Sequence, residues 1–428
     1  METSRIKHVS IEKLWGIKTI STDLFENVNI FIGANGSSKT TFLSLIEAAL
    51  LVDLSVLANI DFEGICITFD GSVIQKLRIA KDYSDDIPVV HYQFDDGPLY
   101  DLPCTESLGR LYRVSTKFRD SLIEVKHILN SAIDISWLSV NRGDSISSDF
   151  ERRGDGPERL KNMVDAKLRD LVRNLVLFQL QLESEANKVS NKFKEDVLSL
   201  MLYNEEFDSY NREMVEKFSS IDTSSMQAAL YRAFNAMGLD QDKKIAIKKH
   251  IQSIKDVVEK VKASQRIDLN DVFVLALINR TFSIIDISKE HEIQTKSIFE
   301  PIENFKKYLK GFMPDKEFVF NKENSGEYSV LLKGNDQKEV SLGITSLSSG
   351  EKQLFILLSE ALLQREKPYV FIADEPELSL HIGWQRRILG ELLKLNPNAQ
   401  LIVATHSPEI AGNFPDNVIN MSSIVSYE

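Results

Sequence analysis

Short apolar runs that end abruptly in polar or acidic residues stand out in this chain. Residues 28–32 lead into a loop of small residues, residues 369–373 lead into Asp374 and Glu375, and residues 401–404 lead into a polar trio. Such runs are typical of strands buried on both faces of a parallel sheet. Because open α/β sheets bind ligands beyond the carboxyl ends of their strands, the two acids are candidates for a ligand site. A solvated acidic turn is the alternative.

Alternating apolar positions predict further strands around the first of these runs. Residues 5–32 contain the pattern of two strands before the run itself, and residues 62–94 the pattern of antiparallel hairpins. Another strand is expected at residues 135–140. Arg142, just after it, is either a surface arginine or a contact to a ligand or partner.

The middle of the chain has a helical pattern. It lacks proline between Pro157 and Pro301, and its apolar residues recur every three or four positions between residues 168 and 218 and again between 247 and 261. This spacing predicts two helices that pair as an antiparallel coiled-coil arm, with a break near residues 199–206 as an alternative to one long helix. Strands around residues 324–326 follow. We therefore expect an N-terminal lobe at residues 1–150, a helical insertion at 151–312 and a C-terminal lobe at 313–428.

The composition is that of a globular protein. The 428 residues allow two or three domains, and 43% of them are hydrophobic. Two cysteines, Cys66 and Cys104, exclude a disulfide framework and a cysteine zinc site. The chain has no run of 18 apolar residues and no signal-peptide core at its start. We expect a cytoplasmic protein without membrane segments.

The charge disfavours general nucleic-acid binding. There are 51 basic and 63 acidic residues, which gives a net charge of -12. A local basic patch at residues 243–249 leaves direct binding open, although a solvated helix face explains these lysines equally well. Aromatic residues are not interleaved with them, so single-strand stacking has little support.

The loop after residue 32 has the composition of a phosphate-binding loop. Strand, loop and helix succeed one another here, as such a loop requires. Backbone N–H groups would bind phosphate, Lys39 would reach the β and γ phosphates, and the Thr40 hydroxyl would bind Mg²⁺. Nucleotide binding is expected. Ser38 stands where the motif has glycine, so we expect weaker binding or slower turnover if its side chain crowds the phosphates and no effect if it faces away. The candidate nucleotide-binding residues here are Gly33, Asn35, Gly36, Ser37, Ser38, Lys39, Thr40 and Thr41.

Two further segments are uninformative by themselves. Ser348 and Gly350 open an apolar helix, which an ordinary N-cap would explain. His406 follows the run at 401–404, and a lone histidine there is usually structural.

The order of all these motifs resembles the ABC-type ATPases, in the branch of SMC, RecF and OLD-like proteins. The resemblance covers residues 5–56 and 340–412 and implies an α/β ATPase head with a mixed sheet, a P-loop, flanking helices and an inserted arm. In such proteins two heads enclose two ATP molecules, so it also implies a homodimer or higher oligomer. Ser349 departs from the double glycine of the signature, and no glutamine loop can be assigned beyond a guess at Gln93.

The resemblance assigns a role to each motif. Lys39 and Thr40 form the Walker A pair; Asp374 is the Mg²⁺ ligand and Glu375 the catalytic base of Walker B. Ser348 and Gly350 form the signature that reaches a partner's γ-phosphate. Residues 377–381 correspond to the D-loop, and His406 is the catalytic switch histidine. The implied cofactors are ATP and Mg²⁺.

The resemblance also suggests a biological role. OLD-family nucleases carry a Toprim domain after the ATPase, but only 22 residues follow His406, so we expect no nuclease on this chain. An ATPase of this kind is similar to those of PARIS-type and Septu-type anti-phage systems. The hypothesis is a slow ATPase that senses infection and holds a separately encoded effector, a Toprim-like or HNH-type nuclease or toxin. A DNA-repair ATPase of the RecF or SMC type is the alternative, and a transporter subunit a weaker one.

Overall fold

The polypeptide folds into two compact units. One contains residues Met1–Val176 and Asn304–Glu428, and the other contains Leu177–Glu303. The computed structural model describes residues 4–71, 73–83, 88–104, 116–139, 157–200, 202, 223–238, 244–263, 265–266, 268–321, 327–333 and 339–427. Arg142 and the predicted turn at residues 324–326 lie outside the described residues.

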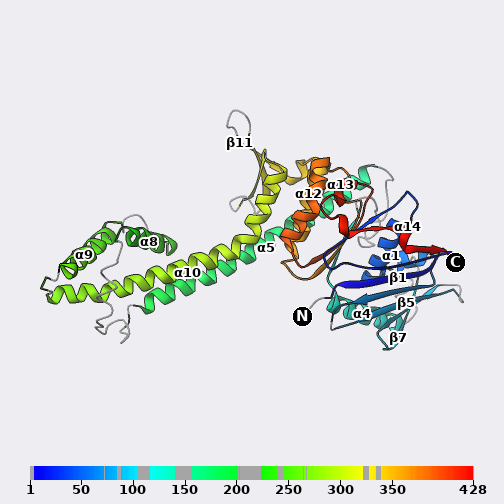
Figure 1. Ribbon diagram of the computed structural model, residues 1–428, viewed down its shortest axis with the longest axis horizontal. Helices are drawn as coiled ribbons and strands as arrows, with labels where there is room; N and C mark the ends of the chain where they lie inside the picture. Colours follow the sequence, from blue (N-terminus) through cyan, green and yellow to red (C-terminus); the bar gives the residue numbers. More distant parts are fainter. Residues whose placement is uncertain are drawn as a thin grey trace. The chain divides into compact units, whose positions relative to one another are not determined.

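An antiparallel sheet forms one layer of the first unit (Figure 1). Its strand order is β15-β2-β1-β4-β5-β6-β7, with β1 bonded to both β2 and β4. Alternate residues of β4 and β6 are buried, because one face of the sheet covers the core. The strands before residue 28 and the hairpins at 62–94 are thereby confirmed. The strands are β1 Ile6–Leu14, β2 Lys18–Asp23, β4 Gly64–Phe69, β5 Lys76–Asp82, β6 Val89–Phe94, β7 Leu99–Pro103 and β15 Val425–Tyr427.

A parallel sheet contains the strands whose carboxyl ends are predicted to form the ligand site; we call this edge of the sheet the ligand edge. Its strand order is β14-β3-β13-β12-β8, and every neighbouring pair is parallel. β12 and β13 are in a register that pairs Asp374 with Ala404, so the acids and the residues after 404 emerge at one edge. The strands are β3 Val28–Ile32, β8 Ile135–Ser139, β12 Tyr369–Asp374, β13 Ala399–Ala404 and β14 Val418–Asn420.

The helix α1 belongs to the core shared by these two sheets. It is apolar on nearly all sides, as is typical of a helix that is buried within a protein core. The rings of Phe31 in β3 and Phe42 in α1 lie 5.2 Å apart, and α1 also packs on β12 and β13. The helices of this unit are α1 Lys39–Leu51, α2 Leu54–Asn59, α4 Thr116–Ala132, α11 Ser349–Leu363, α12 Ile382–Leu395, α13 Pro408–Ala411, α14 Met421–Ile424, and the 3-10 turns η2 Ile344–Ser346 and η3 Pro415–Asn417.

A small antiparallel sheet precedes α11. Its strand order is β11-β10-β9, which confirms the strands predicted around residues 324–326. Phe318 of β9 stacks on Phe355 of α11 with 5.5 Å between ring centroids, so this sheet is attached to the helix that carries the signature segment. The strands are β9 Lys316–Asn321, β10 Glu327–Lys333 and β11 Glu339–Gly343.

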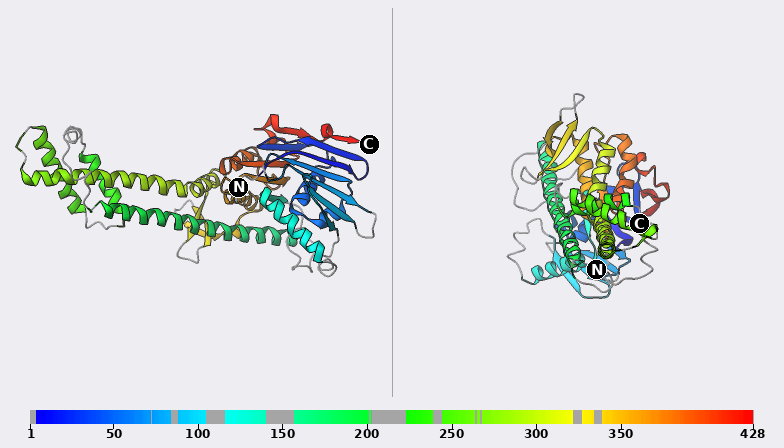
Figure 2. Two further views of the ribbon diagram at one scale, coloured as in Figure 1. Left: turned by 90° about the horizontal axis from the view of Figure 1, so that it is seen from below. Right: turned by 90° about the vertical axis from the view of Figure 1, so that its left-hand side faces the viewer.

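The second unit is helical, and the chain enters and leaves it within long helices. α5 (Pro157–Ser199) ends where a break was considered, and α10 (Leu269–Phe312) continues through Pro301. The two helices run side by side (Figures 1 and 2), and Phe193 of α5 stacks on His291 of α10 at 4.7 Å. α8 (Thr223–Ala236) and α9 (Lys244–Lys262) complete the unit.

The predicted helix pairing is wrong. The segment at 247–261 was expected to pair with the one that begins near 168, but α10 takes that place. The apolar side of α9 instead packs against α8 and α10. Its residues Ile247, Ile251 and Ile254 lie in one buried cluster with Met226 of α8 and Ile278 of α10. No helix within the described residues is both long and apolar enough to cross a membrane.

Candidate nucleotide site

The loop between β3 and α1 has the backbone of an anion-binding turn. Gly36 and Ser38 both have positive φ, +80° and +73°, which turns the chain sharply into the helix that begins at Lys39. Ser38 is the N-cap of α1, but its side chain does not cap the helix. The first N–H groups of a helix have no partner within the helix and attract anions. The context predicted for a P-loop is therefore present.

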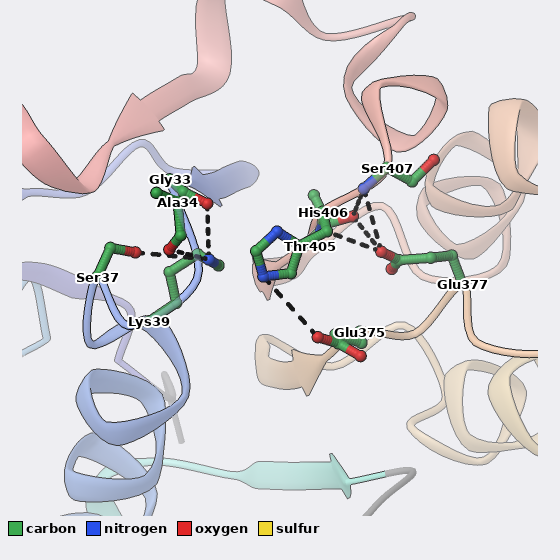
Figure 3. Close-up of polar contacts among 9 residues, drawn as sticks. All are labelled: Gly33, Ala34, Ser37, Lys39, Glu375, Glu377, Thr405, His406 and Ser407. Carbon is green, nitrogen blue, oxygen red and sulfur yellow. Dashed lines mark hydrogen bonds and ion pairs between the residues drawn. The ribbon is translucent and has the colours of Figure 1, made fainter.

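The Lys39 side chain lies within this loop (Figure 3). Its ammonium donates to the carbonyl oxygens of Gly33 at 2.9 Å and Ala34 at 3.3 Å, and lies 3.4 Å from Ser37 Oγ. Burial lowers the pKa of Lys39, while the nearby carboxylates of Asp374 and Glu375 raise it. The charges of both predicted acids therefore act on the predicted lysine.

The carboxyl ends of β12 and β13 hold the acidic side of the site. Glu375 has a φ of +49°, and its N–H donates to the Ala404 carbonyl at 2.8 Å. This hydrogen bond joins the two strand ends. His406 Nε2 lies 4.0 Å from Glu375 Oε1, so the histidine beyond the neighbouring strand is brought next to the acid, as the motif order implied.

Magnesium fits the oxygen donors at this edge. Mg²⁺ is usually bound by one or two carboxylates together with substrate phosphates and water. Asp374 ends β12, and Thr40 lies in the first turn of α1, which packs on β12. The described residues contain no group of three or more histidine, cysteine or acidic side chains arranged for a metal.

The segment at the start of α11, which the resemblance identifies as the signature, is held against the loop that follows β12. Ser348 precedes α11, and its N–H donates to Glu351 Oε2 at 2.9 Å. A Cβ at Gly350 would lie 2.3 Å from the backbone oxygen of Ser379. Glycine is therefore required here by packing within one chain, whatever its part in a partner's site. A substitution at Ser348 tests the signature with less disturbance than one at Gly350.

Glu377 was missed as a site residue by the sequence analysis, which placed it only at the start of the D-loop. Its carboxylate accepts hydrogen bonds from Thr405 and from the main chain of His406 and Ser407. The second acid of the Asp-Glu-Pro-Glu segment was the available signal. Its partners are about thirty positions away in sequence, so their identity comes only from the pairing of β12 with β13.

The structure also explains why glycine is usual at position 38. A φ of +73° is left-handed, and a side chain there costs roughly 1–2 kcal/mol, a cost that glycine avoids. The Ser38 hydroxyl is 3.4 Å from Lys18 Nζ. Backbone conformation is therefore a reason for glycine in addition to the close approach of phosphate.

We expect Ser38→Gly to tighten ATP binding or speed turnover by a few-fold, with the fold unchanged. The glycine removes the strain of the left-handed residue and the side chain from the loop that is expected to bind phosphate. ATP affinity and steady-state turnover measure the effect. Glu366→Gly is the matched control, since Glu366 is exposed, has a φ of +55° and lies in the loop after α11. Equal values for wild type and Ser38→Gly would show that the serine is harmless variation.

Comparisons with known proteins show which proteins this chain is similar to. The family model of the AAA ATPase domain (AAA_15) matches residues 5–411. The chain is 21% identical over 432 residues to the protein named Retron Ec83 probable ATPase from Escherichia coli, which covers 95% of this chain and 69% of the relative. It is 31% identical over 97 residues to Retron Vc95 probable ATPase from Vibrio cholerae serotype O1 biovar El Tor, a match to 20% of this chain and 19% of that relative.

Solved structures of Smc head domains are also similar to this chain. The head with an extended coiled coil, bound to the C-terminal domain of ScpA, from Pyrococcus furiosus has a TM-score of 0.46 at 15% identity, covering 100% of this chain and 96% of that one. The head with a coiled coil and joint from Pyrococcus yayanosii has a TM-score of 0.41 at 15% identity, covering 98% and 95%. Because the family model spans nearly the whole sequence, this chain belongs to the AAA ATPase domain family and is an ATPase.

Proposed function

We propose that ATP binds in the loop between β3 and α1 and is hydrolysed slowly at the adjoining ends of β12 and β13. The observation that supports this most is the Lys39 ammonium inside the loop, 2.9 Å from the Gly33 carbonyl, in the same close-up as His406 4.0 Å from Glu375 (Figure 3). Lys39 offsets the negative charge of the β and γ phosphates, and the N–H groups at the start of α1 bind their oxygens. Thr40 and Asp374 hold Mg²⁺, which supplies further charge neutralisation.

Glu375 and His406 have different tasks in this proposal. Glu375 orients the attacking water and accepts its proton, a task that needs an ionised carboxylate beside the γ-phosphate. His406 donates a hydrogen bond to the γ-phosphate. The Glu375 N–H donates to the Ala404 carbonyl, and this hydrogen bond between the two strand ends helps to keep Glu375 next to His406.

We also propose that two copies share each site. Ser348 and Gly350 of one copy would contact the γ-phosphate bound by the other, so ATP would join the heads into a homodimer or a larger assembly. The packing of Gly350 against Ser379 supports this, because it holds these two segments together while Ser348 and Ser379 stay exposed. ATP binding would then change the oligomer as well as the site.

The biological role we propose is control of a separately encoded effector in anti-phage defence, within the cytoplasm. The names of both relatives assign them to retrons, which supports work inside a multicomponent system. The effector would be a Toprim-like or HNH-type nuclease or a toxin, as in PARIS-type and Septu-type systems. ATP turnover would set when the effector is released or activated.

The helical unit offers a surface for the effector. Four apolar side chains at one side of the N-terminal part of α10 are exposed, and Phe273 is 66% exposed. Clusters of this kind mark interaction sites more often than single exposed residues do. This apolar stripe consists of Leu269, Val272, Phe273 and Leu277.

Co-expression with the neighbouring genes tests the proposed role. We expect the ATPase to co-purify with a protein encoded beside it, and Phe273→Asp to abolish that co-purification. Ile293→Asp is the matched control, because Ile293 is on the same helix and 69% exposed but outside the apolar stripe. Retention of the same protein by Phe273→Asp would remove the stripe from this role.

DNA repair is the second candidate, favoured by exposed lysines on α9. Lys244, Lys248 and Lys249 are exposed, although the net charge of the chain is -12. A repair ATPase that clamps DNA should bind bare duplex with an affinity that falls steeply with salt. Such binding without any co-purifying protein would contradict the defence proposal and support repair.

A further inference from the structure

The carboxylate of Glu377 lies inside the loop that carries His406. Glu377 is only 8% exposed, although it is two residues beyond Glu375 in the loop after β12. Its Oε1 accepts from the Thr405 hydroxyl, from the His406 N–H at 3.2 Å and from the Ser407 N–H at 3.3 Å. Figure 3 shows these contacts on the side of the loop away from Lys39. One oxygen thus holds three consecutive residues after β13.

A glutamine in α12 reinforces the same connection. Gln385 Nε2 donates to the Leu380 carbonyl at 2.9 Å, and Gln385 Oε1 accepts from Ser407 Oγ at 2.7 Å. Leu380 belongs to the loop after β12 and Ser407 to the loop after β13. The two loops are therefore tied at two points, one at Glu377 and one at Gln385.

A carboxyl group is costly to bury in the position of Glu377. Its Oε2 has no hydrogen-bond partner among the described residues, so only one of its two oxygens is satisfied. A buried carboxylate with an unsatisfied oxygen is a poor way to stabilise a fold. An ionised carboxylate does, however, accept stronger hydrogen bonds from N–H groups than an amide does. The hydrogen bonds to Oε1 compensate in part by holding the main chain at residues 405–407.

We propose that Glu377 is a positioning residue for ATP hydrolysis and acts through His406. It fixes the His406 main chain and thereby keeps the imidazole next to the Glu375 carboxylate, where Nε2 and Oε1 are 4.0 Å apart. This inference rests on the proposed roles of Glu375 and His406. Without the anchor, His406 would adopt several positions, and a displacement of about 1 Å is enough to cost a large part of the rate.

The test compares kcat and ATP affinity for Glu377→Gln. We expect kcat to fall about 10- to 100-fold while the Kd for ATP stays within about threefold, because the phosphate-binding loop is untouched. Thr405→Val, which removes one donor to the same oxygen, should lower kcat less. Glu391→Gln is the matched control. Glu391 is a buried acid of α12 whose Oε1 pairs with Arg387 and Lys394 and whose Oε2, like that of Glu377, has no partner in the described part of the chain. It should retain wild-type kcat.

A double-mutant cycle separates positioning from a general structural role. If Glu377 acts through His406, Glu377→Gln should change kcat by less than about twofold in a His406→Ala background. Losses that multiply in the double variant, or wild-type kcat in Glu377→Gln, would overturn the inference. Failure of the proposed site is a different outcome: Glu375→Gln and His406→Ala would then both keep wild-type turnover, regardless of Glu377.

Discussion

Glu375→Gln should retain ATP and lose turnover by about a hundredfold or more, the usual contribution of a general base. Glutamine has nearly the shape of glutamate, but it cannot accept a proton from the attacking water. The Lys39 loop and the start of α1 are unchanged, so binding persists. Since ATP joins the heads in the proposed dimer, the ATP-bound dimer should accumulate. Phosphate release, nucleotide retention and light scattering on the same sample measure the three effects.

The control for this variant is an acid just outside the site. Glu409→Gln alters a carboxylate that pairs with Arg386, three positions after His406, and should keep wild-type turnover. Wild-type turnover in Glu375→Gln would remove Glu375 from its assigned role. Loss of ATP binding together with turnover would instead indicate that this residue supports the nucleotide loop.

Mixing two inactive variants should restore activity. Lys39→Ala removes the ammonium that lies in the phosphate loop, and Ser348→Arg places bulk and charge on the surface expected to face a partner's phosphate. Each alone should lower turnover by at least about a hundredfold. In a mixed dimer, however, one of the two composite sites is intact. An equal mixture should recover about a quarter of wild-type turnover if subunits exchange freely and one site can act alone.

The two variants must fail for different reasons. Lys39→Ala should not bind ATP, whereas Ser348→Arg should bind it normally, because its own phosphate loop is intact. Nucleotide binding measured before mixing checks this difference. Full activity of Ser348→Arg by itself would contradict a site shared between two chains.

The ligand edge was predictable because its determinants are local. The residues after β3, β12 and β13 follow short buried runs, and parallel pairing places all such strand ends at one edge. The sequence therefore predicted the proximity of Lys39, Glu375 and His406 without any knowledge of the intervening residues. Family resemblance added the roles of these residues, which spacing alone cannot supply.

Contacts between distant segments were less predictable. The apolar spacing of α9 resembles that of a coiled-coil helix, yet α10 lies beside α5 and α9 packs into a separate cluster. Several helices with similar apolar faces can exchange partners, and periodicity does not distinguish them. The backbone conformation of Ser38 was also not predictable, because a serine in the sequence does not indicate a φ of +73°.

A structure of Glu375→Gln with ATP and Mg²⁺ tests the central claim, one ATP site completed by two copies, most directly. The account predicts a dimer in which Lys39 contacts the β and γ phosphates, Thr40 and Asp374 approach Mg²⁺, and Ser348 of the second copy contacts the γ-phosphate. ATP bound away from Lys39, or bound at Lys39 in a dimer whose Ser348 side chains both face solvent, would contradict it.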